Sequence, residues 1–148
     1  MTRDERIVEA IAHYQQRFRL GDWQIAYEAD NTHLGKNHLA ITHIRNHQRC
    51  ATIRIDSDAE ADIERIVVHE LMHLVLYDFT ELAGHVITKQ KGGNLGVIDW
   101  LSEGVERICE QVAEAMTGVP WRPYGKRTEA IHAPFLQSFV SSQEAING

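Results

Sequence analysis

The spacing of apolar residues predicts a helix at the start of the chain. Ile7, Ile11, Tyr14 and Phe18 recur at helical intervals, so their side chains would share one face. Thr2 precedes this run as the expected N-cap, and acidic residues follow it in the first turn, where the helix dipole favours negative charge. We therefore expect an amphipathic helix that ends near residue 20.

Three short segments then alternate apolar and polar residues. The segments are residues 23–27, 39–44 and 51–55, and a period of two is typical of strands with one buried face. The polar run at residues 45–49 suits a hairpin connection between the second and third segments. The sequence therefore predicts three strands before the next helix.

The longest apolar run of the chain, residues 66–76, predicts a helix that is covered on most sides. Asp56, Ser57 and Asp58 lie upstream as expected capping residues, and the helix is expected to run to about Tyr77. Together with the three strands, this run predicts an α+β domain built around one central helix.

The second half of the chain shows weaker patterning. A short helix is expected at residues 81–87 and a loop at residues 89–94. A longer helix follows, with Asp99 or Ser102 as its expected N-cap and with Gly118 and Pro120 ending it. Residues 121–148 are expected to form a short helix packed on the body and a frayed end. The apolar face of the longer helix comprises Leu101, Val105, Ile108, Cys109, Val112 and Met116.

Composition narrows the class of protein. A chain of 148 residues with 43% hydrophobic residues can bury one core, so we expect a single domain over residues 1–148, with its core at about 3–120 and an extension at 121–148. Cys50 and Cys109 are expected to be reduced, and the chain has no signal-peptide pattern or membrane-length apolar stretch, which favours a cytoplasmic protein. A formal charge of −6 argues against nucleic acid as a partner.

Two histidines four residues apart interrupt the apolar run of the central helix. His69 and His73 would lie on one helix face with Cβ atoms about 5–6 Å apart, close enough for both imidazoles to bind one metal ion. Glu70 lies beside them, in the position where the H-E-x-x-H motif has its general base. The sequence therefore predicts a metal site on this helix, with Glu70 free for catalysis.

The other histidines are not expected to bind this metal. His33, His38, His43 and His47 lie in the strand region at spacings that match neither one helix face nor a close pair of ligands, so we expect them to face solvent. His85 follows the motif by twelve residues without a pattern that would direct it to the site. We expect none of the five to be a ligand.

Two glutamates of the helix expected after residue 98 are candidates for a further metal ligand. Helical periodicity places Glu106 nearer the apolar face of that helix and Glu103 almost opposite. If Asp99 or Ser102 caps the helix, however, Glu103 stands in the first turn, where the cap sets the direction of the side chain. Gly104 would then give the central helix room to approach. Geometry leaves both candidates open.

The H-E-x-x-H motif and the segment Trp100-Leu101-Ser102-Glu103-Gly104 together resemble the gluzincin class of zinc metallopeptidases. The resemblance covers roughly residues 18–117 and extends to small phage and bacterial metallopeptidases of the minimal-zincin type. It implies a minimal zincin-like fold and one zinc ion per chain, held by His69, His73 and Glu103, with Glu70 as the general base. Glu106 would then contact a ligand histidine or lie at the surface.

The resemblance implies a zinc-dependent peptidase that acts on a peptide or protein substrate. By analogy with zincins, the strand at residues 51–55 would be an exposed edge that holds the substrate backbone. Two alternatives stay open: a regulatory or structural protein of phage or bacterial origin that uses zinc only for stability, and a protease dedicated to one regulatory partner. Glu70 favours catalysis, because a structural zinc site has no use for an extra carboxylate. No oligomeric state follows from the sequence.

Overall fold

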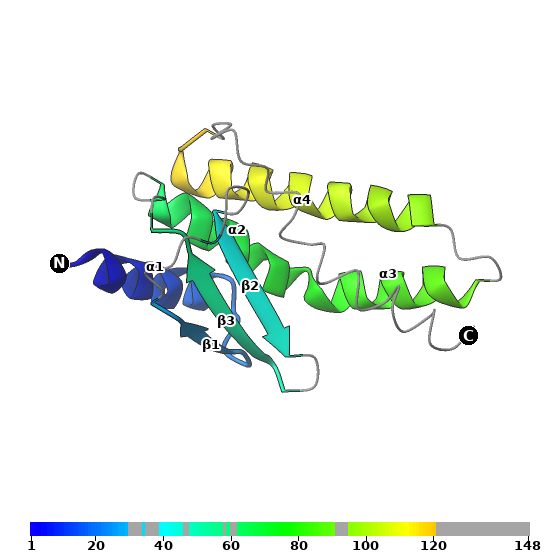
Figure 1. Cartoon of the computed structure of the whole chain (residues 1–148), viewed down its shortest axis with the longest axis horizontal. Helices are drawn as coiled ribbons and strands as arrows, with labels where there is room; N and C mark the ends of the chain where they lie inside the picture. The colour runs from blue at the N-terminus through cyan, green and yellow to red at the C-terminus, as the bar shows by residue number, and fades with distance from the viewer. Residues whose placement is uncertain are drawn as a thin grey trace.

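The computed structural model describes residues 1–29, 34, 39–45, 48–57, 59, 62–90 and 95–120. The helix expected within residues 121–148 lies outside the described residues, as does most of the loop expected at 89–94. Four helices and three strands confirm the predicted α+β class (Figure 1). In chain order the elements are α1 (Arg3–Arg17), β1 (Gln24–Tyr27), β2 (Ala40–Arg45), β3 (Cys50–Ile55), α2 (Ile63–Val75), α3 (Tyr77–Lys89) and α4 (Leu95–Thr117).

The three strands form a mixed sheet with the order β1-β3-β2. β1 runs parallel to β3, with Ile25 opposite Ala51, and β2 runs antiparallel to β3, with Thr42 opposite Ile53. Because β3 is paired with a strand on each side, its backbone N–H and C=O groups already form hydrogen bonds within the sheet. The prediction that residues 51–55 form an exposed edge is therefore wrong, and the edges of the described sheet are β1 and β2.

Helix α1 has the start and the buried face that its sequence predicts. The backbone N–H of Glu5 donates to Oγ1 of Thr2 at 3.2 Å, and the N–H of Thr2 donates to the Glu5 carboxylate at 2.6 Å. This reciprocal capping box satisfies two of the backbone donors that a helix start leaves open. The buried side chains of α1 are Ile7, Ala10, Ile11 and Tyr14.

Helix α2 carries the apolar run and is buried at every residue from Arg65 to Leu74. It begins later than predicted: its N-cap is Asp62, so the proposed capping role of residues 56–58 is wrong. Asp56 is fully buried, and its carboxylate instead accepts the backbone N–H of Leu34 at 2.9 Å. The acidic residue that suggested a cap thus binds the backbone of Leu34 instead.

Helices α3 and α4 are both longer than the sequence predicts. α3 spans 13 residues, where a short helix was expected. α4 begins at Leu95, so Asp99 and Ser102 lie inside the helix and neither is its N-cap. Its predicted end is confirmed: Gly118 follows Thr117 with a φ of 68°, a conformation that glycine adopts without the strain that a Cβ brings.

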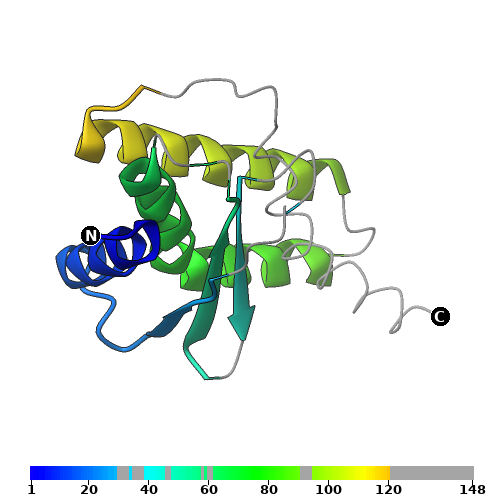
Figure 2. The ribbon, with the colours of Figure 1, turned by 60° about the vertical axis from the view of Figure 1, so that its left-hand side comes forward.

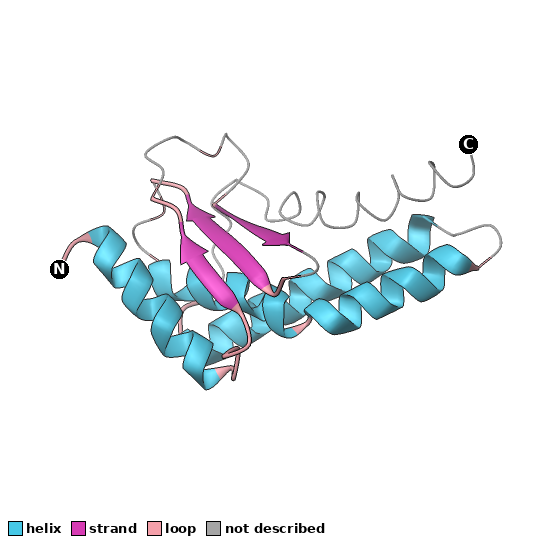
Figure 3. Cartoon of the chain, turned by 90° about the horizontal axis from the view of Figure 1, so that it is seen from below, coloured by secondary structure: helices cyan, strands magenta, loops and turns pink. Residues whose placement is uncertain are grey.

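The sheet and the helices α1 and α4 surround α2. Figures 1 and 2 show α1 and α4 packed on different sides of α2, and Figure 3 shows the sheet covering the helices from one side. Val67, Leu71 and Ile53 are fully buried where these layers meet. The half of α4 nearest Leu95 pairs with α3 in a helical hairpin that extends past the sheet. No helix in the described part of the chain is long and apolar enough to cross a membrane.

Candidate metal centre

The histidine motif lies on the part of α2 that is enclosed by α4 and β2. His69, Glu70 and His73 are only 3%, 1% and 7% exposed. One ligand atom from each lies within 4.8 Å of the others, and the two imidazole rings have centroids 4.9 Å apart. The structure therefore brings these three residues together, as their spacing on one helix predicts, into a group that could hold a metal ion.

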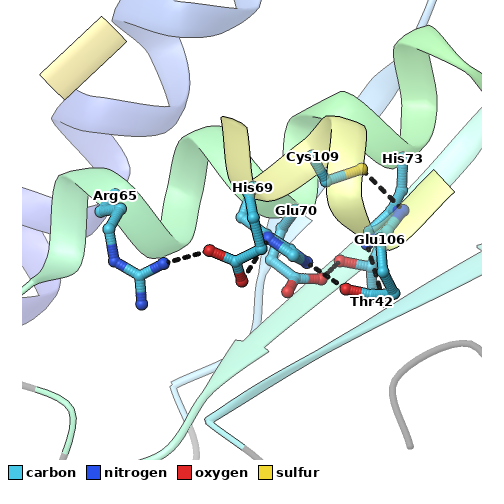
Figure 4. Close-up of polar contacts among 8 residues, drawn as sticks. Thr42, Arg65, His69, Glu70, His73, Glu106 and Cys109 are labelled. Atoms are coloured by element: carbon cyan, nitrogen blue, oxygen red, sulfur yellow. Dashed lines mark hydrogen bonds and ion pairs between the residues drawn. The ribbon is translucent and has the colours of Figure 1, made fainter. Parts of the chain in front are cut away.

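Glu106 of α4 reaches both histidines. Its Oε2 lies 3.2 Å from Nε2 of His69, and its Oε1 lies 3.9 Å from Nε2 of His73. The side chain is buried and points from α4 toward α2 (Figure 4). Two imidazole nitrogens and one carboxylate thus face a common point between the two helices.

Glu103, the third ligand that the resemblance implies, lies elsewhere. It is exposed on α4. The described residues hold two groups that could bind a metal ion, His69 with Glu70 and His73, and His69 with Glu106 and Glu110, and Glu103 belongs to neither. Since α4 begins at Leu95, Glu103 stands in the helix interior, where periodicity and not a cap sets its direction. A Cβ at Gly104 would meet nothing within 4 Å, so the expected close approach there is also wrong. Glu103 stays a prediction from the resemblance, whereas the geometry favours Glu106.

Glu110, one turn beyond Glu106, contacts the other side of the His69 ring. Its Oε1 lies 3.1 Å from Nδ1 of His69, and its Oε2 accepts a hydrogen bond of 2.7 Å from Nη1 of Arg65. The Arg65 side chain is 2% exposed. The sequence analysis missed both residues, although each stands four positions from a site residue on its own helix, Arg65 from His69 and Glu110 from Glu106.

Two further side chains hold the motif from the other directions. The Thr42 hydroxyl on β2 donates a short hydrogen bond to Oε2 of Glu70, and Sγ of Cys109 lies 3.4 Å from Nδ1 of His73 (Figure 4). Burial, aided by the nearby Glu106 carboxylate, raises the pKa of the Cys109 thiol, so the sulfur stays protonated. Cys109 is a free thiol, as expected, but it borders the site rather than packing only as a small hydrophobe.

The carboxylates make this site attractive to cations. Burial alone would lower the pKa of His69, but the carboxylates of Glu106 and Glu110 outweigh it and raise the pKa to about 10. A protonated imidazole therefore occupies the metal-free site at neutral pH. Glu70, Glu106 and Glu110 thus bring three carboxyl groups to His69, and only Glu110 also contacts the buried guanidinium of Arg65. This concentration of acidic groups favours a cation between α2 and α4.

The donor set is of a kind that binds metal ions in proteins. Two imidazoles and one carboxylate are the protein ligands of a well-known class of catalytic zinc sites, which keep a fourth position open. Nε2 of His69 is buried and lies near Oε2 of Glu106, but the two atoms do not form a hydrogen bond. A metal ion would give this nitrogen a partner. His69, His73 and Glu106 could therefore hold a metal ion, with Oε1 of Glu110 on the other side of the His69 ring, 3.1 Å from Nδ1.

The remaining histidines do not join this site where they are described. His43 and His85 are exposed, as expected, and His33, His38 and His47 lie outside the described residues. Comparisons with protein-family models, with curated proteins and with solved structures found no match. The geometry of the site therefore carries the functional argument alone.

Proposed function

We propose that this protein is a zinc-dependent peptidase in which His69, His73 and Glu106 hold the metal and Glu70 is the general base. The observation that carries the proposal is the placement of Glu70. Its carboxylate is 1% exposed, lies beside both imidazoles and receives a hydroxyl hydrogen bond from Thr42. A structural metal site needs its ligands only, whereas a hydrolytic site needs one more group that accepts a proton.

Each residue around Glu70 has its own role in the proposed reaction. When bound, zinc would supply Lewis acidity, polarising the scissile carbonyl and lowering the pKa of water at the open position. Glu70 accepts the proton from the attacking water and later delivers it to the leaving amine. The Thr42 hydroxyl donates to Oε2 of Glu70 and so orients the carboxylate that accepts the proton. Oε1 of Glu110 lies 3.1 Å from Nδ1 of His69 and would stabilise a proton on that nitrogen, so that Nε2 offers its lone pair to the metal.

β2 is the element best placed to hold a peptide substrate. Thr42 lies on β2 and contacts Glu70, so this strand passes beside the site. β2 is also an edge of the described sheet. A peptide that adds alongside β2 would form backbone hydrogen bonds and bring its carbonyl toward the histidines. β2 thus takes the role that the sequence analysis gave to residues 51–55.

Deep burial of the site favours a second candidate, a metal centre that only stabilises the fold. His69, Glu70, His73 and Glu106 are each at most 9% exposed, and Arg65 further closes the network through Glu110. Under this alternative the ion would tie α2 to α4, and the chain would act through a partner. Glu70 would then have no chemical role, which makes it the residue that separates the two candidates.

Cleavage of a peptide library tests the proposal. Peptides prepared from a proteome are incubated with the zinc-loaded protein, with the protein after chelation, and with the chelated protein after zinc is restored. We expect new termini to appear with zinc, to disappear on chelation and to return with zinc. A protein that holds one zinc ion per chain but generates no new termini would favour the stabilising role.

A further inference from the structure

Cys109 of α4 faces His73 of α2 inside the contact between the two helices. Its Sγ lies 3.4 Å from Nδ1 of the histidine (Figure 4). Cys109 is fully buried and His73 is only 7% exposed, so this contact is shielded from water. Which of the two atoms donates the hydrogen depends on where the imidazole carries its proton. The proposed reaction has so far given the contact no role.

Three residues on one face of α4 reach the two histidines. Cys109 and Glu110 stand three and four positions after Glu106, so the three side chains share a helix face. Glu106 faces Nε2 of both rings, at 3.2 and 3.9 Å. Glu110 lies 3.1 Å from Nδ1 of His69, just as Cys109 lies beside Nδ1 of His73. α4 therefore supplies one carboxylate between the two Nε2 atoms and one further side chain at each Nδ1 atom.

This arrangement decides which nitrogen of His73 is turned to the metal position. Nε2 lies on the side of Glu106, whereas Nδ1 lies on the side of the sulfur. An imidazole that binds a metal through Nε2 carries its proton on Nδ1, and the partner of Nδ1 sets the orientation of the ring. We propose that Cys109 is a positioning residue, whose Sγ accepts a hydrogen bond from Nδ1 of His73 and so holds Nε2 toward the metal.

The two ligand histidines are thus held by contacts of different strength. A carboxylate is a strong acceptor of hydrogen bonds, whereas sulfur is a weak one. We therefore expect the loss of Cys109 to weaken metal binding by about tenfold, at the low end of the range for residues that orient a ligand histidine. The inference rests on the proposed ligand set, in which His73 binds the metal through Nε2, but it does not depend on peptide cleavage.

Zinc affinities of two Cys109 variants test the positioning role. In Cys109→Ser a hydroxyl oxygen can accept from Nδ1, so the affinity should stay close to that of the unmodified protein, whereas Cys109→Ala should lose about tenfold. Val105→Ala is the matched control, because Val105 is buried at 4% exposure one turn earlier on α4 and the substitution removes only apolar atoms. Titration against a competing chelator measures the affinities, and circular dichroism verifies that each variant folds.

Replacement of zinc by cobalt(II) distinguishes a positioning residue from a metal ligand. In the described residues Cys109 belongs to neither group that could bind a metal ion, so the cobalt-loaded protein should lack the charge-transfer absorption of a cobalt–thiolate bond. A band of that kind that disappears in Cys109→Ser would make Cys109 a ligand and overturn the proposal. Equal losses of zinc affinity in Cys109→Ala and Val105→Ala would also overturn it, because packing alone would then explain the effect.

Nitrogen-15 NMR of the zinc-loaded protein observes the proposed hydrogen bond itself. We expect zinc on Nε2 of His73 and a proton on Nδ1 that exchanges slowly with solvent, and this exchange should be faster in Cys109→Ala than in Cys109→Ser. Zinc on Nδ1, or equal exchange in the two variants, would contradict the positioning role. If the unmodified protein shows the expected spectrum but cleaves no peptide, the positioning role is supported and the proposed peptidase activity is wrong.

Discussion

Oε1 of Glu110 lies 3.1 Å from Nδ1 of His69, on the side of the ring opposite Glu106. The other oxygen of Glu110 accepts from Arg65 at 2.7 Å, so the carboxylate is held between a buried guanidinium and the imidazole. A ring fixed at Nδ1 has one tautomer and one orientation, with Nε2 directed to the metal position. Under the proposed ligand set, Glu110 would orient His69 as a ligand.

This arrangement predicts that Glu110→Gln weakens zinc binding by about 10–100-fold, as is typical when a ligand histidine loses its carboxylate partner. Glutamine keeps the shape and can still accept from Arg65, so the fold should persist. Titration against a competing chelator measures the affinity. Glu114→Gln, an exposed residue one turn further along α4, is the control, and equal affinities of the two variants would show that Glu110 has no such role.

Zinc affinities of Glu106→Ala and Glu103→Ala decide between the two candidate ligands. We expect Glu106→Ala to lose far more than the 10–100-fold expected of a supporting residue, because its carboxylate faces both imidazoles. Glu103→Ala should bind zinc like the unmodified protein, since Glu103 is exposed. The reverse result would restore the assignment that the gluzincin resemblance implies.

Zinc binding should release a proton. The neighbouring carboxylates outweigh burial and raise the pKa of His69 to about 10, so the imidazole is protonated in the metal-free protein below that pH and must be neutral to bind zinc. Affinity should therefore rise with pH, by roughly tenfold per unit between about pH 6 and pH 8. Calorimetry in buffers of different ionisation enthalpy counts the protons. If zinc binding released no proton, the prediction that His69 is protonated in the metal-free protein would be wrong.

Removal of zinc should lower the melting temperature, because the ion joins α2 to α4 and its binding energy adds to the folding energy. With free zinc about a hundredfold above the dissociation constant, the shift should be roughly 5–10 °C. Thermal denaturation before and after chelation measures it, with zinc content determined on both samples. If the melting curve is unchanged after complete removal of zinc, the metal does not stabilise the fold.

The parts of the site that depend on local geometry could be predicted from the sequence. His69 and His73 share a face because an α-helix repeats every 3.6 residues, and the same periodicity pointed to Glu106. Glu110 and Arg65 could not be assigned, since their pairing depends on how α4 packs against α2. Glu103 follows from the gluzincin resemblance, and the helix start at Asp99 or Ser102 that would allow it lies within α4.

The fold shows the same division between local and long-range information. The alternation of apolar and polar residues predicted the positions of the three strands. It gave no information on their order in the sheet, which is β1-β3-β2. A central strand and an edge strand can have the same alternating pattern, because the pattern shows which face of the strand is buried and not how many strands pair with its backbone. The analogy with zincins gave the edge role to β3, and the alternating pattern could not show that β2 is the edge strand that lies beside Glu70.

The most direct test of the proposed function compares zinc content and peptide cleavage in Glu70→Gln, with Glu64→Gln as the control because Glu64 is exposed on the same helix. Glutamine keeps the shape of Glu70 but cannot accept the proton. Glu70→Gln should hold one zinc ion per chain and generate no new termini from the peptide library, whereas Glu64→Gln should match the unmodified protein. Cleavage by Glu70→Gln at the rate of the unmodified protein would contradict the assignment of Glu70 as the general base.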